Sequence, residues 1–223
     1  MRFFTFLFLF LTLSFASFSQ LVHDESYSDM DFWLFKQKLE QAVIHKNQMA
    51  FKDLLADTVW EGHFLCGECS KDAFMQDYFG DGKAAHTWKQ LLNVIRFGFS
   101  KIQQSPNESF IFKAPSYLDS VDTENELIIL GENVNIRAKA GTNSEVIHQA
   151  SYEKFKCDCN ITTNKDSTFQ FVNNQLWVEI YVDDQTTGYV LASLTSQAIY
   201  KRMTVKKIDG TWKITSFYNP PGC

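Results

Sequence analysis

Val134-Asn-Ile-Arg137 and Trp177-Val-Glu-Ile-Tyr-Val182 decide the fold class, because in both stretches Val and Ile recur at every second position. Side chains of a strand point alternately to its two faces, so this spacing predicts half-buried β-strands. Working outward toward the C-terminus, the segments 198–207 and 211–218 show strand character and flank Asp209-Gly210. Asp-Gly is a strong signal for a two-residue hairpin turn. The second half of the chain is therefore predicted to be β.

Residues 28–102 show helical spacing instead. Ser28 and Asp31 have capping-box spacing, and Ser70 is a candidate N-cap for a later helix. The longest pattern predicts a helix whose buried stripe runs to Ile102. Its members are Trp88, Leu91, Leu92, Ile95, Phe99 and Ile102.

Four pieces of the β half occur in an informative order: Ile129-Leu-Gly-Glu-Asn-Val-Asn-Ile-Arg137, Gly141-Thr-Asn-Ser-Glu-Val-Ile147, Trp177-Val-Glu-Ile180 and Gly188-Tyr-Val190. Together they resemble a bacterial SH3 domain over residues 126–195. The resemblance implies a small β-barrel that acts as a binding module, with peptidoglycan peptides or envelope proteins as partners.

This sequence departs from that family's pattern at three places. The glycine typical of the turn before the middle strand is absent around Tyr152–Phe155. Lys139-Ala-Gly-Thr142 replaces the usual Gly-Pro of the first loop, and a polar insertion, 157–175, precedes the central Trp strand. The departures leave the inherited ligand preference open.

The C-terminal hairpin follows the SH3-like unit, and two strands alone are marginal in water. We therefore expect it to return to the helical region and join strands near Thr58–His63 and Ser109–Lys113. The predicted fold is α+β: an N-terminal helical region, 20–113, completed by a C-terminal β-hairpin, 197–223, with an inserted SH3-like β-barrel, 126–195.

The first nineteen residues have the three regions of a signal peptide. Arg2 supplies the positive charge, Phe3–Phe15 is almost wholly apolar, and Ser17-Phe-Ser19 places small residues before a predicted cleavage at Gln20. The alternative is a membrane anchor, but a spanning helix needs about 20 apolar residues. The expectation is a periplasmic or secreted protein with no transmembrane anchor in its mature form.

The formal net charge is −5, and no basic stripe accompanies it. The densest basic group is interpreted as a solvated strand face: Lys201, Arg202, Lys206 and Lys207. Nucleic acid is therefore not an expected partner, because phosphate backbones require a cationic face.

The five cysteines include a CxxC pair, Cys66 and Cys69, a CxC pair, Cys157 and Cys159, and Cys223. In an oxidising compartment Cys66, Cys69, Cys157 and Cys159 are disulfide candidates, and the sequence does not choose their connectivity. Free thiols, a four-thiolate zinc site and a redox CxxC remain alternatives. No cofactor and no metal are expected.

No catalytic residues are assigned from the sequence. His63 and His86 are candidate partners for a cysteine nucleophile, but no cell-wall amidase motif accompanies them. Asp72, Asp77 and Asp81 do not have calcium-loop spacing and are interpreted as marking a helix end.

The ligand-binding candidates are aromatic and basic residues of the barrel: Arg137, Trp177, Tyr181 and Tyr189. They would line a shallow groove, with the arginine for a ligand carboxylate. The alternative for Trp177 is a packing residue. The expected function is binding of an envelope peptide, peptidoglycan or a partner protein. A small hydrolase-like or ligand-binding domain, with a cleft between the helices and the C-terminal hairpin, is the alternative.

Overall fold

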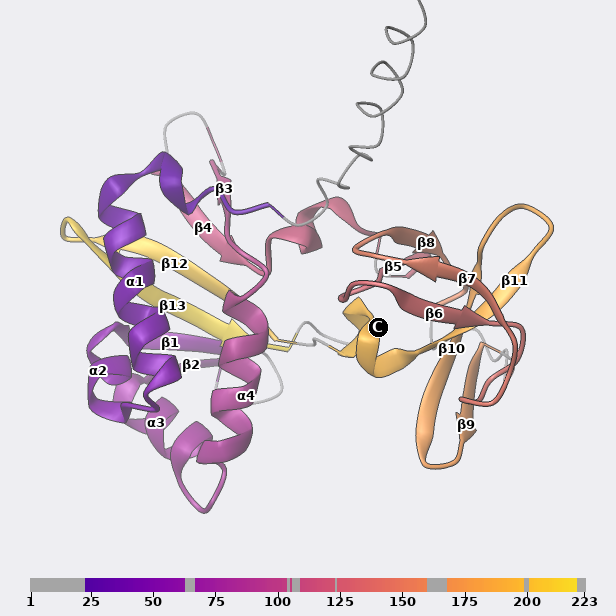
Figure 1. Ribbon diagram of the computed structural model, residues 1–223. Helices are drawn as coiled ribbons and strands as arrows, with labels where there is room; N and C mark the ends of the chain where they lie inside the picture. The colour runs from indigo at the N-terminus through magenta and orange to yellow at the C-terminus, as the bar shows by residue number, and fades with distance from the viewer. Residues whose placement is uncertain are drawn as a thin grey trace, which may run out of the picture.

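The computed structural model describes residues 23–62, 67–103, 105, 109–122, 124–159, 168–198 and 201–219, which form an α+β protein (Figure 1). One part contains the helices and a mixed six-stranded sheet, and the other is a curled antiparallel sheet of seven strands. The expected signal peptide, His63, Cys66 and Cys223 lie outside the described residues. No helix within the described ranges has the length and apolarity that crossing a membrane requires.

Polar side chains cap the starts of the first three of the four described α-helices. The Phe32 amide donates to Asp29 Oδ1 at 2.9 Å, so the N-cap is Asp29 and the capping box predicted from Ser28 is wrong. The Ser70 cap is confirmed, because the Ala73 amide donates to its hydroxyl at 3.2 Å. The helices are α1 (Met30–Ile44), α2 (Gln48–Asp53), α3 (Lys71–Phe79) and α4 (Ala84–Ile95).

Helix α4 ends at Ile95, seven residues before the predicted limit at Ile102. Gly98 has φ +73°, which takes the backbone out of the helix, and a Cβ there would lie 2.6 Å from the His23 carbonyl oxygen. Phe99 is still fully buried, but Ile102 belongs to a strand, β3 (Ser100–Ile102). The prediction failed because a regular apolar spacing continued past a glycine that turns the chain.

The C-terminal hairpin lies in the middle of the six-stranded sheet, whose order is β2-β1-β13-β12-β4-β3. Strand β13 pairs in parallel with β1, and β12 pairs antiparallel with β4, so the predicted return of the hairpin is confirmed. Asp209 and Gly210 both have positive φ, as a tight hairpin turn requires. The other strands of this sheet are β1 (Leu55–Gly62), β2 (Gly67–Ser70), β4 (Ile111–Ala114), β12 (Arg202–Ile208) and β13 (Thr211–Tyr218).

The helices cover one face of this sheet and bury an aromatic core against it (Figure 1). Phe32 of α1 stacks on Phe112 of β4 with ring centroids 3.5 Å apart. Trp212 of β13 meets both rings edge-on, at 5.2 and 5.3 Å. These contacts join the first helix to the last hairpin.

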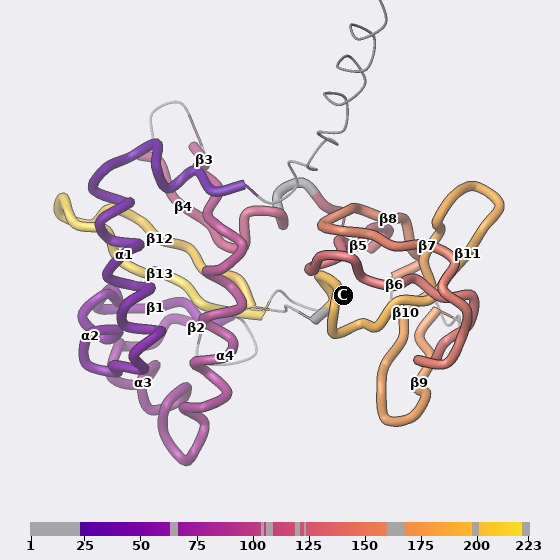
Figure 2. Tube along the Cα trace, viewed as in Figure 1, coloured from indigo at the N-terminus to yellow at the C-terminus, as the bar shows by residue number. Residues whose placement is uncertain are grey.

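The second sheet curls on itself as a half-barrel, in the order β5-β8-β10-β11-β6-β7, with β9 also paired to β10 (Figure 2). Part of the segment interpreted as a polar insertion forms strand β9, which corrects that interpretation. Three short 3₁₀ turns flank the curled sheet in the chain: Ser116–Ser120 precedes β5, and Ala192–Leu194 and Ser196–Ala198 follow β11. The strands are β5 (Glu126–Ile128), β6 (Val134–Arg137), β7 (Val146–Ala150), β8 (Lys154–Lys156), β9 (Phe169–Val172), β10 (Gln175–Tyr181) and β11 (Thr187–Leu191).

Strand β5 and the two residues after it are buried on both faces. Leu127 and Ile129 belong to the core of the curled sheet, whereas Ile128 and Leu130 belong to the core of the helical part. The Ile128 amide also donates to the Ser196 hydroxyl at 3.1 Å, where the chain leaves the curled sheet. The four consecutive apolar residues 127–130 therefore join the two parts, because they pack alternately into the two cores.

Candidate functional site

Two of the four predicted ligand-binding residues lie side by side on the outer face of the curled sheet. Arg137 of β6 is opposite Tyr189 of β11, which is opposite Glu179 of β10. The Tyr189 hydroxyl donates to Glu179 at 2.9 Å and accepts from Gln170 at 3.1 Å. Burial, and then the bond to Glu179, raise the pKa of Tyr189. Arg137 also donates a hydrogen bond to the Ser144 carbonyl at 2.5 Å. The polar groups of Arg137, Tyr189 and Glu179 therefore already have hydrogen-bond partners within the protein.

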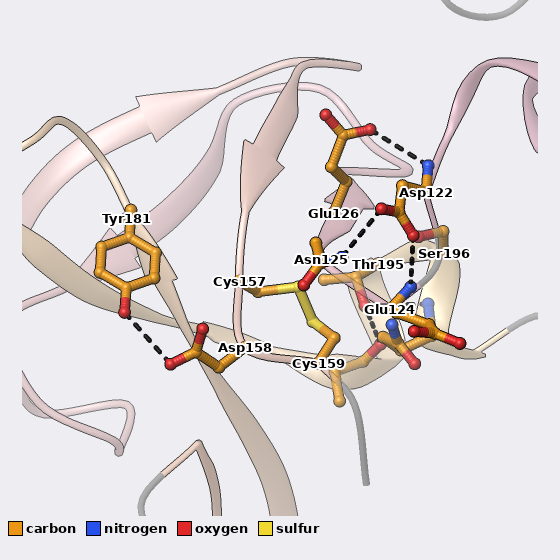
Figure 3. The surroundings of a disulfide bond; sticks show 12 residues. Asp122, Glu124, Asn125, Glu126, Cys157, Asp158, Cys159, Tyr181, Thr195 and Ser196 are labelled. Atoms are coloured by element: carbon orange, nitrogen blue, oxygen red, sulfur yellow. Dashed lines mark hydrogen bonds between the residues drawn. A yellow bond between two sulfur atoms is a disulfide. The ribbon is translucent and has the colours of Figure 1, made fainter. Parts of the chain in front are cut away.

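Trp177 and Tyr181 lie toward opposite ends of β10. Trp177 is only 3% exposed, so its ring packs inside the protein and lines no surface groove here. Tyr181 is 42% exposed, and its hydroxyl donates to Asp158 at 3.2 Å (Figure 3). Of the four candidates, Tyr181 is the one that borders a groove.

The groove beside Tyr181 has a volume of about 880 Å³ and runs along β8 to the end of β10. Two lysines line it, Lys154 and Lys156, together with Phe155 and His148. Six carboxylates outnumber these lysines: Asp122, Glu126, Glu153, Asp158, Asp183 and Asp184. The groove therefore has an excess of negative charge around one accessible aromatic ring.

Hydrogen bonds keep several of these carboxylates ionised. The Lys154 ammonium, 3.0 Å from Glu126, lowers the pKa of that carboxyl. Asn125 does the same for Asp122, and the Gln185 amide for Asp183. These three carboxyls therefore remain ionised to a lower pH than free carboxyls do.

A disulfide between Cys157 and Cys159 forms the floor beside this groove, and both residues are buried (Figure 3). The sequence left the connectivity of the candidate cysteines open, and here Cys157 pairs with Cys159, so that the intervening Asp158 is the partner of Tyr181. Cys69 is disulfide-bonded as well and lies on β2 of the other sheet.

The other sequence candidates are ordinary structural residues. His86 is exposed on α4, and Asp72 pairs with Lys52. Asp81 lies with positive φ directly after α3, so the interpretation as a helix end is confirmed for that residue. These positions form no catalytic arrangement with one another.

A second polar cluster, which the sequence analysis did not bring together, lies where α3 meets the six-stranded sheet. Glu61, near the end of β1, is 2% exposed, and Lys201, just before β12, is 7% exposed. The Lys201 ammonium donates to the Tyr78 hydroxyl at 2.7 Å, and that hydroxyl donates to the Phe217 carbonyl at 3.2 Å. The interpretation of Lys201 as a solvated basic residue is therefore wrong, because it packs against the rings of Tyr78 and Phe217.

Burial perturbs the titration of this cluster. It raises the pKa of Glu61 to about 7, with the Asp77 carboxylate adding to the effect and Lys201 opposing it. Burial also lowers the pKa of Lys201 to about 8, opposed by Glu61. Perturbed acid–base pairs of this kind often mark functional sites.

Glu61, Asp77 and Cys69 bring one potential ligand atom each within 4.8 Å of one another. Because the Cys69 sulfur is oxidised in a disulfide, the two carboxylates are the ligands that this group keeps among the described residues. A stable structural site normally has more protein ligands than this.

No protein family matches the chain, and no curated protein or solved structure is detectably similar to it. The function must follow from the geometry. Two signals available in the sequence were an acidic residue in a predicted strand, Glu61, and the acidic residues that surround Tyr181. Neither signal shows which side chains the fold buries.

Proposed function

We propose that this chain is an exported binding protein whose curled sheet is an SH3-like module that holds a cationic peptide. The single observation that carries the proposal is the groove of about 880 Å³, which is lined by six carboxylates and by the exposed Tyr181. An envelope protein or the peptide part of peptidoglycan would supply the ligand. The proposed location is the periplasm or the exterior.

The groove suits an extended basic segment for two physical reasons. Its charge attracts lysine or ammonium groups and accelerates their encounter with the protein. The Tyr181 ring offers a flat, partly apolar surface. Its hydrogen bond to Asp158 already holds the ring in place, so binding a ligand does not require the side chain to lose conformational freedom. Charge and a preorganised ring together favour a peptide over a purely apolar ligand.

The binding proposal is tested with Tyr181→Ala, titrated with a fluorescently labelled Ala-Lys-Ala-Lys-Ala-Lys peptide and sedimented with purified peptidoglycan. We expect the peptide affinity to fall by about tenfold, because a central aromatic contact is lost. Added salt should weaken wild-type binding.

The control is Tyr27→Ala, which removes a still more accessible tyrosine, 71% exposed, from the helical part. It should bind as the wild type does. Equal affinities for all three proteins, or a stronger preference for an Ala-Glu repeat, would contradict the proposal.

A second candidate function is acid–base catalysis at Glu61. The supporting observation is a carboxyl with a pKa of about 7 whose oxygen lies within 4.8 Å of the Asp77 carboxylate. A carboxyl with a raised pKa beside a second carboxyl is an arrangement used for glycoside hydrolysis. Hydrolysis of aryl N-acetylglucosaminides that Glu61→Gln abolishes would support it, and identical rates for the two proteins would refute it.

A further inference from the structure

The six-stranded sheet has a second face, opposite the helices. Residues that alternate with those of the aromatic core line a saddle of about 670 Å³ on this face. Val59 of β1 points into the core, for example, whereas Thr58 and Trp60 border the saddle. None of the residues that line the saddle belongs to the buried core of the helical part, as far as the chain is described.

An aromatic pair lies at one end of this saddle. Trp60 of β1 and Tyr218 of β13 meet edge to face, with ring centroids 4.4 Å apart. Both side chains are partly exposed. Each aromatic ring has an apolar face and a polar end, so the pair suits a ligand that has both kinds of surface.

Hydroxyl groups form much of the floor. They come from three adjacent strands, on side chains too short to fill the saddle: Thr58, Thr204, Thr215 and Ser216. The Thr215 hydroxyl donates to the Thr204 carbonyl at 3.4 Å, a long hydrogen bond. Such a floor offers donors and acceptors to a polyhydroxylated ligand and little to an aliphatic one.

Two lysines supply positive charge beside the hydroxyls. Lys113 of β4 is opposite Thr204, and Lys206 of β12 is opposite Ile111, so the two are near neighbours on this face. Neither lysine takes part in an ion pair among the described residues. Two unneutralised ammonium groups beside an aromatic and hydroxyl surface complement a ligand that carries a carboxylate.

We propose that this open face binds a carboxylate-bearing oligosaccharide, a function separate from the peptide groove of the curled sheet. The apolar C–H face of a sugar ring packs on Trp60 and Tyr218, the sugar hydroxyls bond to the threonines, and the sugar carboxylate pairs with Lys113 and Lys206. Asp57 and Glu68 also border the saddle. These carboxylates disfavour a densely charged polyanion such as nucleic acid.

The test is calorimetric titration of the full chain with a hyaluronan tetrasaccharide, which alternates acidic and acetamido sugars. Neutral chitotetraose and hexaglutamate serve as comparison ligands. We expect the acidic sugar to bind at least about tenfold more tightly than either, since it alone satisfies both the rings and the lysines.

Two variants separate these contributions. Trp60→Ala should lower the affinities for the acidic and the neutral sugar by about tenfold each. The double variant Lys113→Gln, Lys206→Gln should lower the affinity for the acidic sugar to that for the neutral one. Lys207→Gln is the matched control, because Lys207 lies over the Trp212 ring and pairs with Asp31 of α1. It should leave both affinities unchanged.

Amide chemical shifts of the unmodified protein give a measurement that does not depend on whether a variant folds. The tetrasaccharide should shift amides of β1, β12 and β13 around the saddle. Shifts confined to other surfaces, no binding, or equal binding of hexaglutamate would each overturn the proposal.

Discussion

A chain that ends after Ser196 should fail to fold its helical part, because it lacks the two central strands of the six-stranded sheet. Without β12 and β13, β1 and β4 lose their inner neighbours. The hairpin also contributes five buried core residues: Met203, Val205, Trp212, Ile214 and Phe217. Loss of one large core side chain costs about 2–5 kcal/mol, so losing all five costs about 10–25 kcal/mol, which is comparable to or larger than the whole stability of a typical domain, about 5–15 kcal/mol.

Circular dichroism during thermal unfolding measures this effect. The truncated chain should lose most of its native helicity and melt without a cooperative transition, whereas a chain that ends after Asn219 should keep both. Native helicity with a sharp transition in the shorter chain would show that the helical part does not need the hairpin.

The second large effect is an unusual pH dependence of stability, caused by Glu61. Its folded-state pKa, about 7, lies above the ordinary value of 4.5, so the folded protein holds a proton that the unfolded chain has already lost. The contribution of this group to stability is therefore complete below pH 4.5 and is lost as the pH rises to 7. The loss should be on the order of 2–3 kcal/mol.

Lys201 should have the opposite effect at higher pH. Its folded-state pKa, about 8, lies below the ordinary 10.5, so its destabilising charge disappears in the folded state as the pH rises through that interval. The two buried groups together place a minimum of stability between about pH 7 and 8.

Urea unfolding from pH 4.5 to 10 checks this dependence. Glu61→Gln should remove the decrease between pH 4.5 and 7, whereas Glu68→Gln, which changes a partly exposed carboxyl on β2, should preserve it. Parallel curves for Glu61→Gln and the wild type would rule out Glu61 as the cause.

Local chemistry made much of the fold predictable from the sequence. The Asp209-Gly210 turn and the Ser70 cap depend on neighbours in the chain, and both are confirmed. The return of the hairpin followed from the instability of two isolated strands. The end of α4 was mispredicted because the apolar spacing continues to Ile102, while the close approach of His23 to Gly98 is a tertiary contact.

The candidate sites were harder to predict because burial of one polar residue depends on segments far away in the chain. Tyr181 was selected as a strand aromatic, and the structure places it at a groove, whereas Trp177 is buried. Lys201 belonged to a basic group in the sequence, and only its packing against α3 and β13 shows it to be a buried cation. Periodicity reports which face a residue is on and does not report what covers that face.

Strand β5 connects the groove beside Tyr181 directly to the core of the helical part. Glu126 borders the groove, and Ile128, two positions later, packs among the aromatic residues under the helices. A ligand that tightens the first of these positions restrains the second, because no loop separates them. A ligand bound in the groove beside Tyr181 should therefore also make the helical part more rigid, and the two parts should unfold together.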